Sequence, residues 1–142
     1  MKKQSFYILI IGCSRLGVYI ANNLSKLGHS VVIIDEDESS FILLDVNFSG
    51  FKIEGNPAEL ETLRQAKIAK ADIVIVTTRD DNINIMVAQI AKEIFKVPRV
   101  MARIFDPVHE GSYLLKNIDT ICPTSLAGDI LLKAVTDRDE GK

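Results

Sequence analysis

Two segments near the amino end of the chain combine a glycine-containing turn with an acid at the end of an apolar run. An apolar run at residues 6–11 leads directly into Gly12-Cys13-Ser14-Arg15-Leu16-Gly17, and a second apolar run at residues 31–34 ends in Asp35. The first glycine allows a tight turn, and a helix that begins there points its free N–H groups and its positive dipole end at a phosphate. An acid at the tip of the next strand accepts hydrogen bonds from a ribose hydroxyl. The spacing therefore predicts a site for an adenine nucleotide rather than a purely structural turn.

Composition is that of one ordinary globular domain. The chain has 142 residues, of which 47% are hydrophobic and 25% charged, and its net charge is −2. No stripe of lysine and arginine is present, so we expect no nucleic acid partner. The two cysteines, Cys13 and Cys122, lie far apart and show no metal-binding spacing, which is typical of a reducing, cytoplasmic compartment. No apolar run reaches the length of a membrane span, so we expect no direct membrane insertion.

Strand and helix patterns alternate along the whole sequence. Apolar strands are predicted at residues 6–11, 31–34, 50–53, 72–77, 99–104 and 120–122. Helices are predicted at residues 15–27, 38–46, 56–66, 80–95 and 107–116, followed by a last helix that Thr124 or Ser125 would cap. Continuously apolar strands between helices indicate a parallel sheet covered on both faces. We therefore predict a single-domain α/β fold, a Rossmann-like, doubly wound, six-stranded parallel sheet with its ligand at the carboxyl ends of the strands.

Several polar segments occur in an order that resembles one known family. The segments are the glycine turn with its arginine, Asp35, Gly55-Asn56-Pro57, Thr77-Thr78-Arg79-Asp80-Asp81-Asn82-Ile83-Asn84, and Arg103 followed by Asp106-Pro107. Together they resemble the TrkA-N domain, also known as the RCK N-terminal domain, of potassium uptake systems and potassium channels. The resemblance extends from about residue 6 to the last helix.

The resemblance implies a regulatory, gating subunit rather than an enzyme. Such domains bind NAD(H) or the adenine nucleotides AMP, ADP and ATP on the cytoplasmic side of the membrane. They form homodimers or larger homo-oligomers and act on a separate potassium transporter or channel subunit in the membrane. The expected domain covers residues 1–142, with a core at about 6–123 and a C-terminal helix at about 124–137. The C-terminal lobe that usually accompanies this domain is not found in the sequence.

The resemblance also assigns site residues position by position. Backbone N–H groups of the turn would contact phosphates, Asp35 would bind the adenosine ribose, and Arg103 would meet a far phosphate or a second ribose. The turn at Asn56 and Pro57 would lie beside the adenine, and Thr77 and Thr78 would form the floor of the pocket. The full predicted set is Gly12, Cys13, Ser14, Arg15, Leu16, Gly17, Asp35, Asn56, Pro57, Thr77, Thr78 and Arg103.

Two positions depart from the pattern of the family. Ser14 stands where the turn usually has its second glycine, and its Cβ would crowd a pyrophosphate although its hydroxyl could donate to a phosphate oxygen. Asn56 stands where many relatives carry aspartate. Structural alternatives also remain open, because Arg15 could be an exposed first-turn residue and Arg103 could cap a strand end.

The competing hypothesis is a small NAD(P)-dependent oxidoreductase. Such an enzyme needs a proton donor close to its substrate. Tyr113 is followed by Lys116 and therefore lacks the tyrosine-x-x-x-lysine spacing of short-chain reductases. His29 and His109 have no cluster of carboxylates or cysteines around them in the sequence, so we expect neither catalytic residues nor a metal site.

Overall fold

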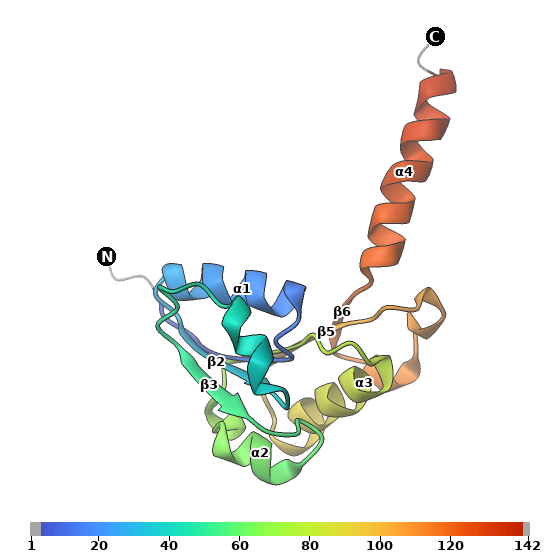
Figure 1. Cartoon of the computed structure of the whole chain (residues 1–142). Helices are drawn as coiled ribbons and strands as arrows, with labels where there is room; N and C mark the ends of the chain where they lie inside the picture. Colours follow the sequence, from blue (N-terminus) through green and yellow to red (C-terminus); the bar gives the residue numbers. More distant parts are fainter. Residues whose placement is uncertain (1–3, 141–142) are drawn as a thin grey trace.

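Six short apolar segments form one sheet in which every pair of neighbouring strands is parallel (Figure 1). The computed structural model describes residues 4–140, without the side chains of Tyr113 and of residues 138–140. The strands are β1 (Tyr7–Ile11), β2 (Ser30–Asp35), β3 (Phe51–Glu54), β4 (Ile73–Val76), β5 (Arg99–Arg103) and β6 (Asp119–Ile121). Their order across the sheet is β3-β2-β1-β4-β5-β6. This order reverses direction between β1 and β4, which is where doubly wound sheets bind ligands.

Helical segments connect the strands. They are α1 (Arg15–Lys26), η1 (Glu38–Leu43), α2 (Leu60–Gln65), η2 (Ile68–Lys70), α3 (Asp81–Gln89), η3 (Ile90–Ile94), η4 (Pro107–His109), η5 (Tyr113–Leu115) and α4 (Pro123–Glu140). Figure 1 shows α1 on one face of the sheet and α2 and α3 on the other.

Alternate residues of each central strand enter two separate hydrophobic clusters. Ile8 and Ile10 of β1 pack with Ala21 of α1 on one face, whereas Leu9 and Ile11 join the cluster on the α2 and α3 face. A strand buried on both faces needs apolar residues at every position, because its side chains alternate between the two faces. This requirement explains why the strands read as continuous apolar runs.

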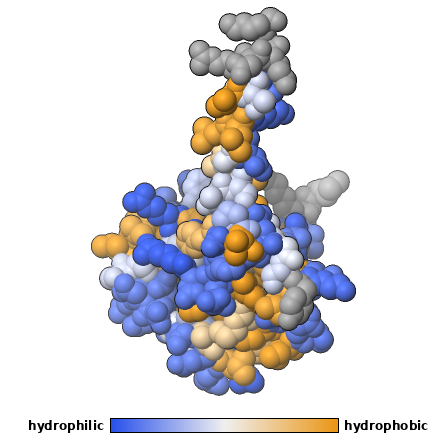
Figure 2. All heavy atoms as spheres, turned by 90° about the vertical axis from the view of Figure 1, so that its right-hand side faces the viewer, coloured by the Kyte–Doolittle hydropathy of each residue, from blue (hydrophilic) through white to orange (hydrophobic). Residues whose placement is uncertain are grey.

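The last helix, α4, projects away from the rest of the chain (Figures 1 and 2). Its apolar side chains are largely exposed: Ile130, Leu131, Leu132 and Val135 are each 67–68% accessible to solvent. Figure 2 shows hydrophobic atoms on this projecting helix beyond the body of the domain.

The predicted fold class is confirmed, but four helical predictions need correction. The segment at 38–46 forms only the short 3-10 helix η1. The segment at 107–116 forms two 3-10 turns, η4 and η5, separated by Gly111 in a left-handed conformation with φ +78°. The long helix predicted at 80–95 changes at Ile90 into a π-helix, η3. The helix predicted from Asn56 begins at Leu60, because the side chain of Asn56 accepts a hydrogen bond from the Ala58 N–H and forms a turn instead.

The start of the last helix also differs from the prediction. Helix α4 begins at Pro123, so Thr124 and Ser125 lie inside its first turn instead of capping it. The Ser125 hydroxyl donates a hydrogen bond to Glu110, with an Oγ–Oε1 distance of 2.6 Å. Proline is favourable at a first helical position because its missing N–H would have no partner there.

Candidate functional site

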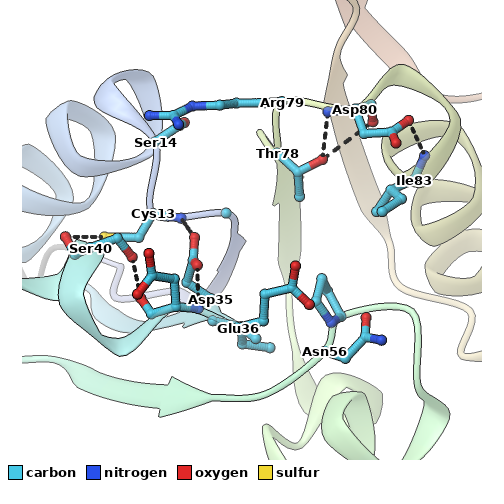
Figure 3. Close-up of a pocket in the computed structure, with 14 residues that line it drawn as sticks. Cys13, Ser14, Asp35, Glu36, Ser40, Asn56, Thr78, Arg79, Asp80 and Ile83 are labelled. Carbon is cyan, nitrogen blue, oxygen red and sulfur yellow. Dashed lines mark hydrogen bonds between the residues drawn. The ribbon is translucent and has the colours of Figure 1, made fainter.

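A cleft of about 360 Å³ opens at the carboxyl ends of the central strands (Figure 3). Its lining comes from four segments, which are residues 12–14, residues 34–37 with Ser40, residues 56–57, and residues 78–80 with Ile83. These segments follow or end β1, β2, β3 and β4, respectively. The parallel sheet therefore brings together four loops that are far apart in the sequence.

The glycine turn is shaped by two very close backbone approaches. Gly12 has φ +107°, and a Cβ atom at this position would lie 2.7 Å from the backbone nitrogen of Thr78. A Cβ on Gly17 would lie 2.1 Å from the carbonyl oxygen of Gly12. Both glycines are thus required for α1 to begin directly against the ends of β1 and β4.

Ser14 is the N-cap of α1. Its Oγ accepts a hydrogen bond from the Gly17 N–H at 3.2 Å and donates to the carbonyl oxygen of Thr77 at 2.8 Å. The hydroxyl hydrogen is therefore engaged within the protein. Donation to a phosphate, as the sequence suggested, would require the bond to Thr77 to be exchanged.

Three backbone N–H groups at the start of α1 are available to a ligand. Within the described part of the chain, the N–H groups of Gly12, Cys13, Gly17 and Val18 have protein acceptors. Those of Ser14, Arg15 and Leu16 do not, as is usual for the first turn of a helix. Such groups, together with the helix dipole, can hold one phosphate.

Asp35 connects the glycine turn to the loop after β2. Its Oδ2 accepts from the Cys13 N–H and its Oδ1 from the Asp37 N–H, both at 2.8 Å. The Cys13 thiol donates to the carbonyl oxygen of Ser40 at 3.3 Å. Burial raises the pKa of the Cys13 thiol, so this group stays protonated and unreactive at neutral pH.

On the other side of the cleft, Asn84 holds the end of β4. Its carboxamide is fully buried, accepts from the Thr78 N–H at 3.0 Å, and donates to the carbonyl oxygens of Thr78 and Arg103 at 3.0 and 2.9 Å. Thr77, which is also buried, donates its hydroxyl to the carbonyl oxygen of Gly12 at 3.0 Å. These bonds join the ends of β1, β4 and β5 into one polar support beneath the cleft.

Arg103 belongs to this support and does not line the cleft. Its Nη2 donates to the carbonyl oxygens of Thr77 and Thr78 at 2.7 and 3.0 Å, and its guanidinium lies 4.3 Å from the centre of the Phe105 ring. Burial is the main cause that lowers the pKa of Arg103, and the positive charge of nearby Arg79 lowers it further. Its Nε is buried without a hydrogen-bond partner among the described residues. This geometry matches the strand-end alternative, and direct contact of Arg103 with a ligand remains a prediction.

The structure brings together seven of the twelve predicted site residues. The residues that line the cleft are Gly12, Cys13, Ser14, Asp35, Asn56, Pro57 and Thr78. The others lie beside or behind it: Arg15, Leu16, Gly17, Thr77 and Arg103. Of these, Gly17, Thr77 and Arg103 are buried, and Arg15 is exposed on the first turn of α1.

Sequence reasoning missed one charged residue in particular. Among the described residues, Arg79 is the only basic residue that lines the cleft, whose lining also includes the acids Asp35, Glu36, Asp37 and Asp80. Its position directly after a buried strand was the signal that could have identified it, because strand ends on this edge surround the ligand in doubly wound folds.

The described residues contain neither a cluster of metal-binding side chains nor a helix that could span a membrane. No group of three or more histidine, cysteine, aspartate or glutamate side chains comes together in this part of the chain. None of its helices combines the length and apolar character that a membrane span requires.

Comparison with known proteins identifies the family of the chain. The sequence profile of the TrkA-N domain matches residues 8–123. The Trk system potassium uptake protein TrkA of Streptomyces coelicolor is 36% identical over 127 residues, which cover 89% of this chain and 57% of that protein. The chain therefore spans little more than half the length of this relative.

Two solved structures show the same fold. A structure of the GsuK channel bound to NAD has a TM-score of 0.79 and 26% identity, covering 98% of this chain and 25% of that one. A structure of GsuK bound to ADP has a TM-score of 0.77 and 27% identity, covering 94% and 34%. With the profile match over most of its length, the chain belongs to the TrkA-N domain family.

Proposed function

We propose that this chain is the nucleotide-sensing regulatory unit of a potassium uptake system or potassium channel. The observation that carries the proposal is the cleft at the switch point of the sheet, where the glycine turn, Asp35 and Arg79 meet. Relatives named as Trk potassium uptake proteins support the potassium system. GsuK structures bound to NAD and to ADP support an adenine nucleotide as the ligand.

Sensing would operate by a shift between two arrangements of the domain. A nucleotide in the cleft would touch loops that follow β1, β2 and β4, and would therefore link both halves of the sheet. A ligand shifts such an equilibrium only as far as its affinities for the two arrangements differ. Different adenine nucleotides, with different phosphate contacts, would then produce different outputs.

The partner contact would involve α4. A helix whose apolar side chains are two-thirds exposed gains free energy by burying them against another surface. We assign this surface to a second copy of the chain, giving a homodimer or larger homo-oligomer. Attachment to the cytoplasmic face of the membrane would come from a separate transporter or channel subunit.

Native mass spectrometry of the purified protein tests the nucleotide and the assembly together. We expect masses of one chain multiplied by the number of copies, each with a bound adenine nucleotide or NAD. Calorimetric titration of the nucleotide-free protein with AMP, ADP and NAD should then show saturable binding. Absence of binding for all three would contradict the proposed function.

A regulatory domain should bind its nucleotide without changing it. We expect no oxidation or reduction of NAD(H) with a panel of small carbonyl compounds, and no ATP hydrolysis above background. The measurement is NADH absorbance and phosphate release over hours. Steady turnover would instead favour the small oxidoreductase.

A further inference from the structure

Charge is distributed unevenly along the cleft. Asp35, Glu36 and Asp37 line one end, and Arg79 lies at the other. Figure 3 shows the Arg79 side chain extended across the cleft toward Ser14, on the side opposite Asp35 and Glu36. A nucleotide has the same polarity, with a neutral adenosine that offers ribose hydroxyls to acids and a phosphate chain that needs cations.

Among the described residues, the Arg79 guanidinium has no ion-pair partner that would keep it from a ligand. The two ion pairs among the described residues are Arg99–Asp119 and His109–Asp81. The neighbouring Asp80 carboxylate is occupied as the N-cap of α3, where it accepts from the N–H groups of Asn82 and Ile83 at 2.8 and 3.3 Å. Arg103, buried at the end of β5, lies near enough for Arg79 to affect its pKa, so two cations occur together here.

The glycine turn can hold one phosphate but has few donors for a second. Only the N–H groups of Ser14, Arg15 and Leu16 remain free at the start of α1, because Asp35 already binds the Cys13 N–H and the Ser14 side chain binds the Gly17 N–H. A second phosphate, further from the adenosine, must find its donors elsewhere. Arg79 lines the same cleft, and its charged fork of N–H groups extends toward Ser14 in Figure 3, so it is placed to supply them.

We propose that Arg79 binds the second phosphate of the nucleotide and makes the cleft select for adenosine ligands with two phosphates over AMP. This inference rests on the proposed function and deepens it, because it names the group by which the site distinguishes its ligands. Arg79 provides the selectivity, whereas the glycine turn and Asp35 bind the adenosine and the first phosphate.

The test is calorimetric titration of the full chain with adenosine, AMP and ADP. Three variants are compared with the original protein. Arg79→Gln removes the charge and keeps a polar side chain, whereas Arg79→Lys keeps the charge. Arg64→Gln is the matched control, since Arg64 is an exposed arginine on α2 outside the cleft.

We expect Arg79→Gln to weaken ADP binding about tenfold or more, the factor for one lost charge-assisted hydrogen bond. Its effect on AMP should stay below about threefold, and adenosine binding should not change. Arg79→Lys should recover most of the ADP affinity, and Arg64→Gln should behave like the original protein.

Three results would overturn the inference. ADP affinity of Arg79→Gln equal to that of the original protein would show that Arg79 does not bind phosphate. Equal losses for AMP and ADP would place Arg79 at the first phosphate. Equal losses for all three ligands, adenosine included, would mean that Arg79 only supports the fold of the cleft. If the original protein binds none of the ligands, the proposed function fails as well, which distinguishes that failure from the other three.

Discussion

At the scale of single residues, Asp35 combines a predicted role in ligand binding with a structural role. The predicted role follows from its position at the tip of β2. The structural role appears only in the fold, where its carboxylate binds the N–H groups of Cys13 and Asp37. These bonds fix the glycine turn relative to the loop that leads into η1. The same carboxylate therefore shapes the cleft and lines it.

Replacing Asp35 should separate these roles. Asp35→Ala should weaken nucleotide binding by on the order of 1.5–3 kcal/mol, through loss of a charge-assisted hydrogen bond to the ribose. It should also lower the free energy of unfolding by about 1–3 kcal/mol, because two N–H groups lose their acceptor. Calorimetry with AMP, ADP and NAD measures the first effect and denaturant unfolding the second.

Asp35→Asn provides the matched comparison. It keeps one acceptor oxygen, so its stability should fall less than that of Asp35→Ala while its nucleotide affinity still falls. Unchanged affinity for AMP, ADP and NAD in both variants would show that the ribose lies elsewhere.

At the scale of elements, one carboxylate ties α3 to the segment that follows β5. Asp81, the first residue of α3, accepts from the N–H groups of Phe105 and Asp106 at 2.7 and 3.0 Å and contacts Nδ1 of His109 at 2.8 Å. Burial acts to raise the pKa of Asp81, but these hydrogen bonds outweigh it and hold the pKa below its usual value. The ionised form therefore stabilises the fold.

This arrangement predicts a stability loss in acid. A carboxyl whose pKa is lowered by folding contributes stability above its unfolded pKa of about 3.9, and loses it as the pH falls through the folded pKa. Asp81→Asn should therefore be less stable than the original protein by about 1–3 kcal/mol at neutral pH, and the gap should narrow below about pH 4. Thermal unfolding between pH 2.5 and 7 measures this difference in stability. Asp129→Asn, at an exposed site on α4, is the control and should be as stable as the original protein at every pH. A stability loss for Asp81→Asn that does not change with pH would contradict the proposed effect of its ionisation.

At the scale of the whole molecule, the domain consists of a two-sided core and one unpartnered helix. The sheet buries its apolar residues on both faces, whereas α4 extends beyond the body with its apolar residues exposed (Figure 1). The nucleotide cleft lies on the sheet, and the proposed contact with a second copy lies on α4. Binding and assembly should therefore be separable by mutation.

A charge on the apolar surface of α4 should dissociate the assembly. Ile130→Glu would place a carboxylate among residues that dimerisation would bury, and burial of an unpaired charge is strongly unfavourable. We expect sedimentation velocity to show a shift toward monomer, with unchanged nucleotide affinity. Lys133→Glu, another exposed charge change on the same helix, is the control. A monomeric original protein, or an Ile130→Glu variant that remains fully assembled, would remove α4 as the interface.

The sequence predicted the strands well and several of the helices poorly. Strands such as β1 and β2 were predicted within one residue at each end, because burial on both faces requires an unbroken apolar run. The helix expected at residues 107–116 was wrong because its hydrogen bonds depend on side chains remote in sequence, among them Asp81. Asn56 was read as a helix cap, although its side chain closes a local turn four residues before α2 begins.

By itself, the sequence determined the family, the order of strands and helices along the chain and the position of the glycine turn. Gly12, Gly17 and Asp35 could be recognised because their roles depend on local spacing along one strand–turn–helix unit. Only the tertiary structure decided which side chains line the cleft. It buried Arg103 against the segment that follows β4 and placed Arg79 in the cleft, although both arginines follow or end neighbouring strands. The physical reason is that a side chain's direction at a strand end depends on contacts from other strands and helices, here the buried carboxamide of Asn84 and the carbonyl oxygens of Thr77 and Thr78.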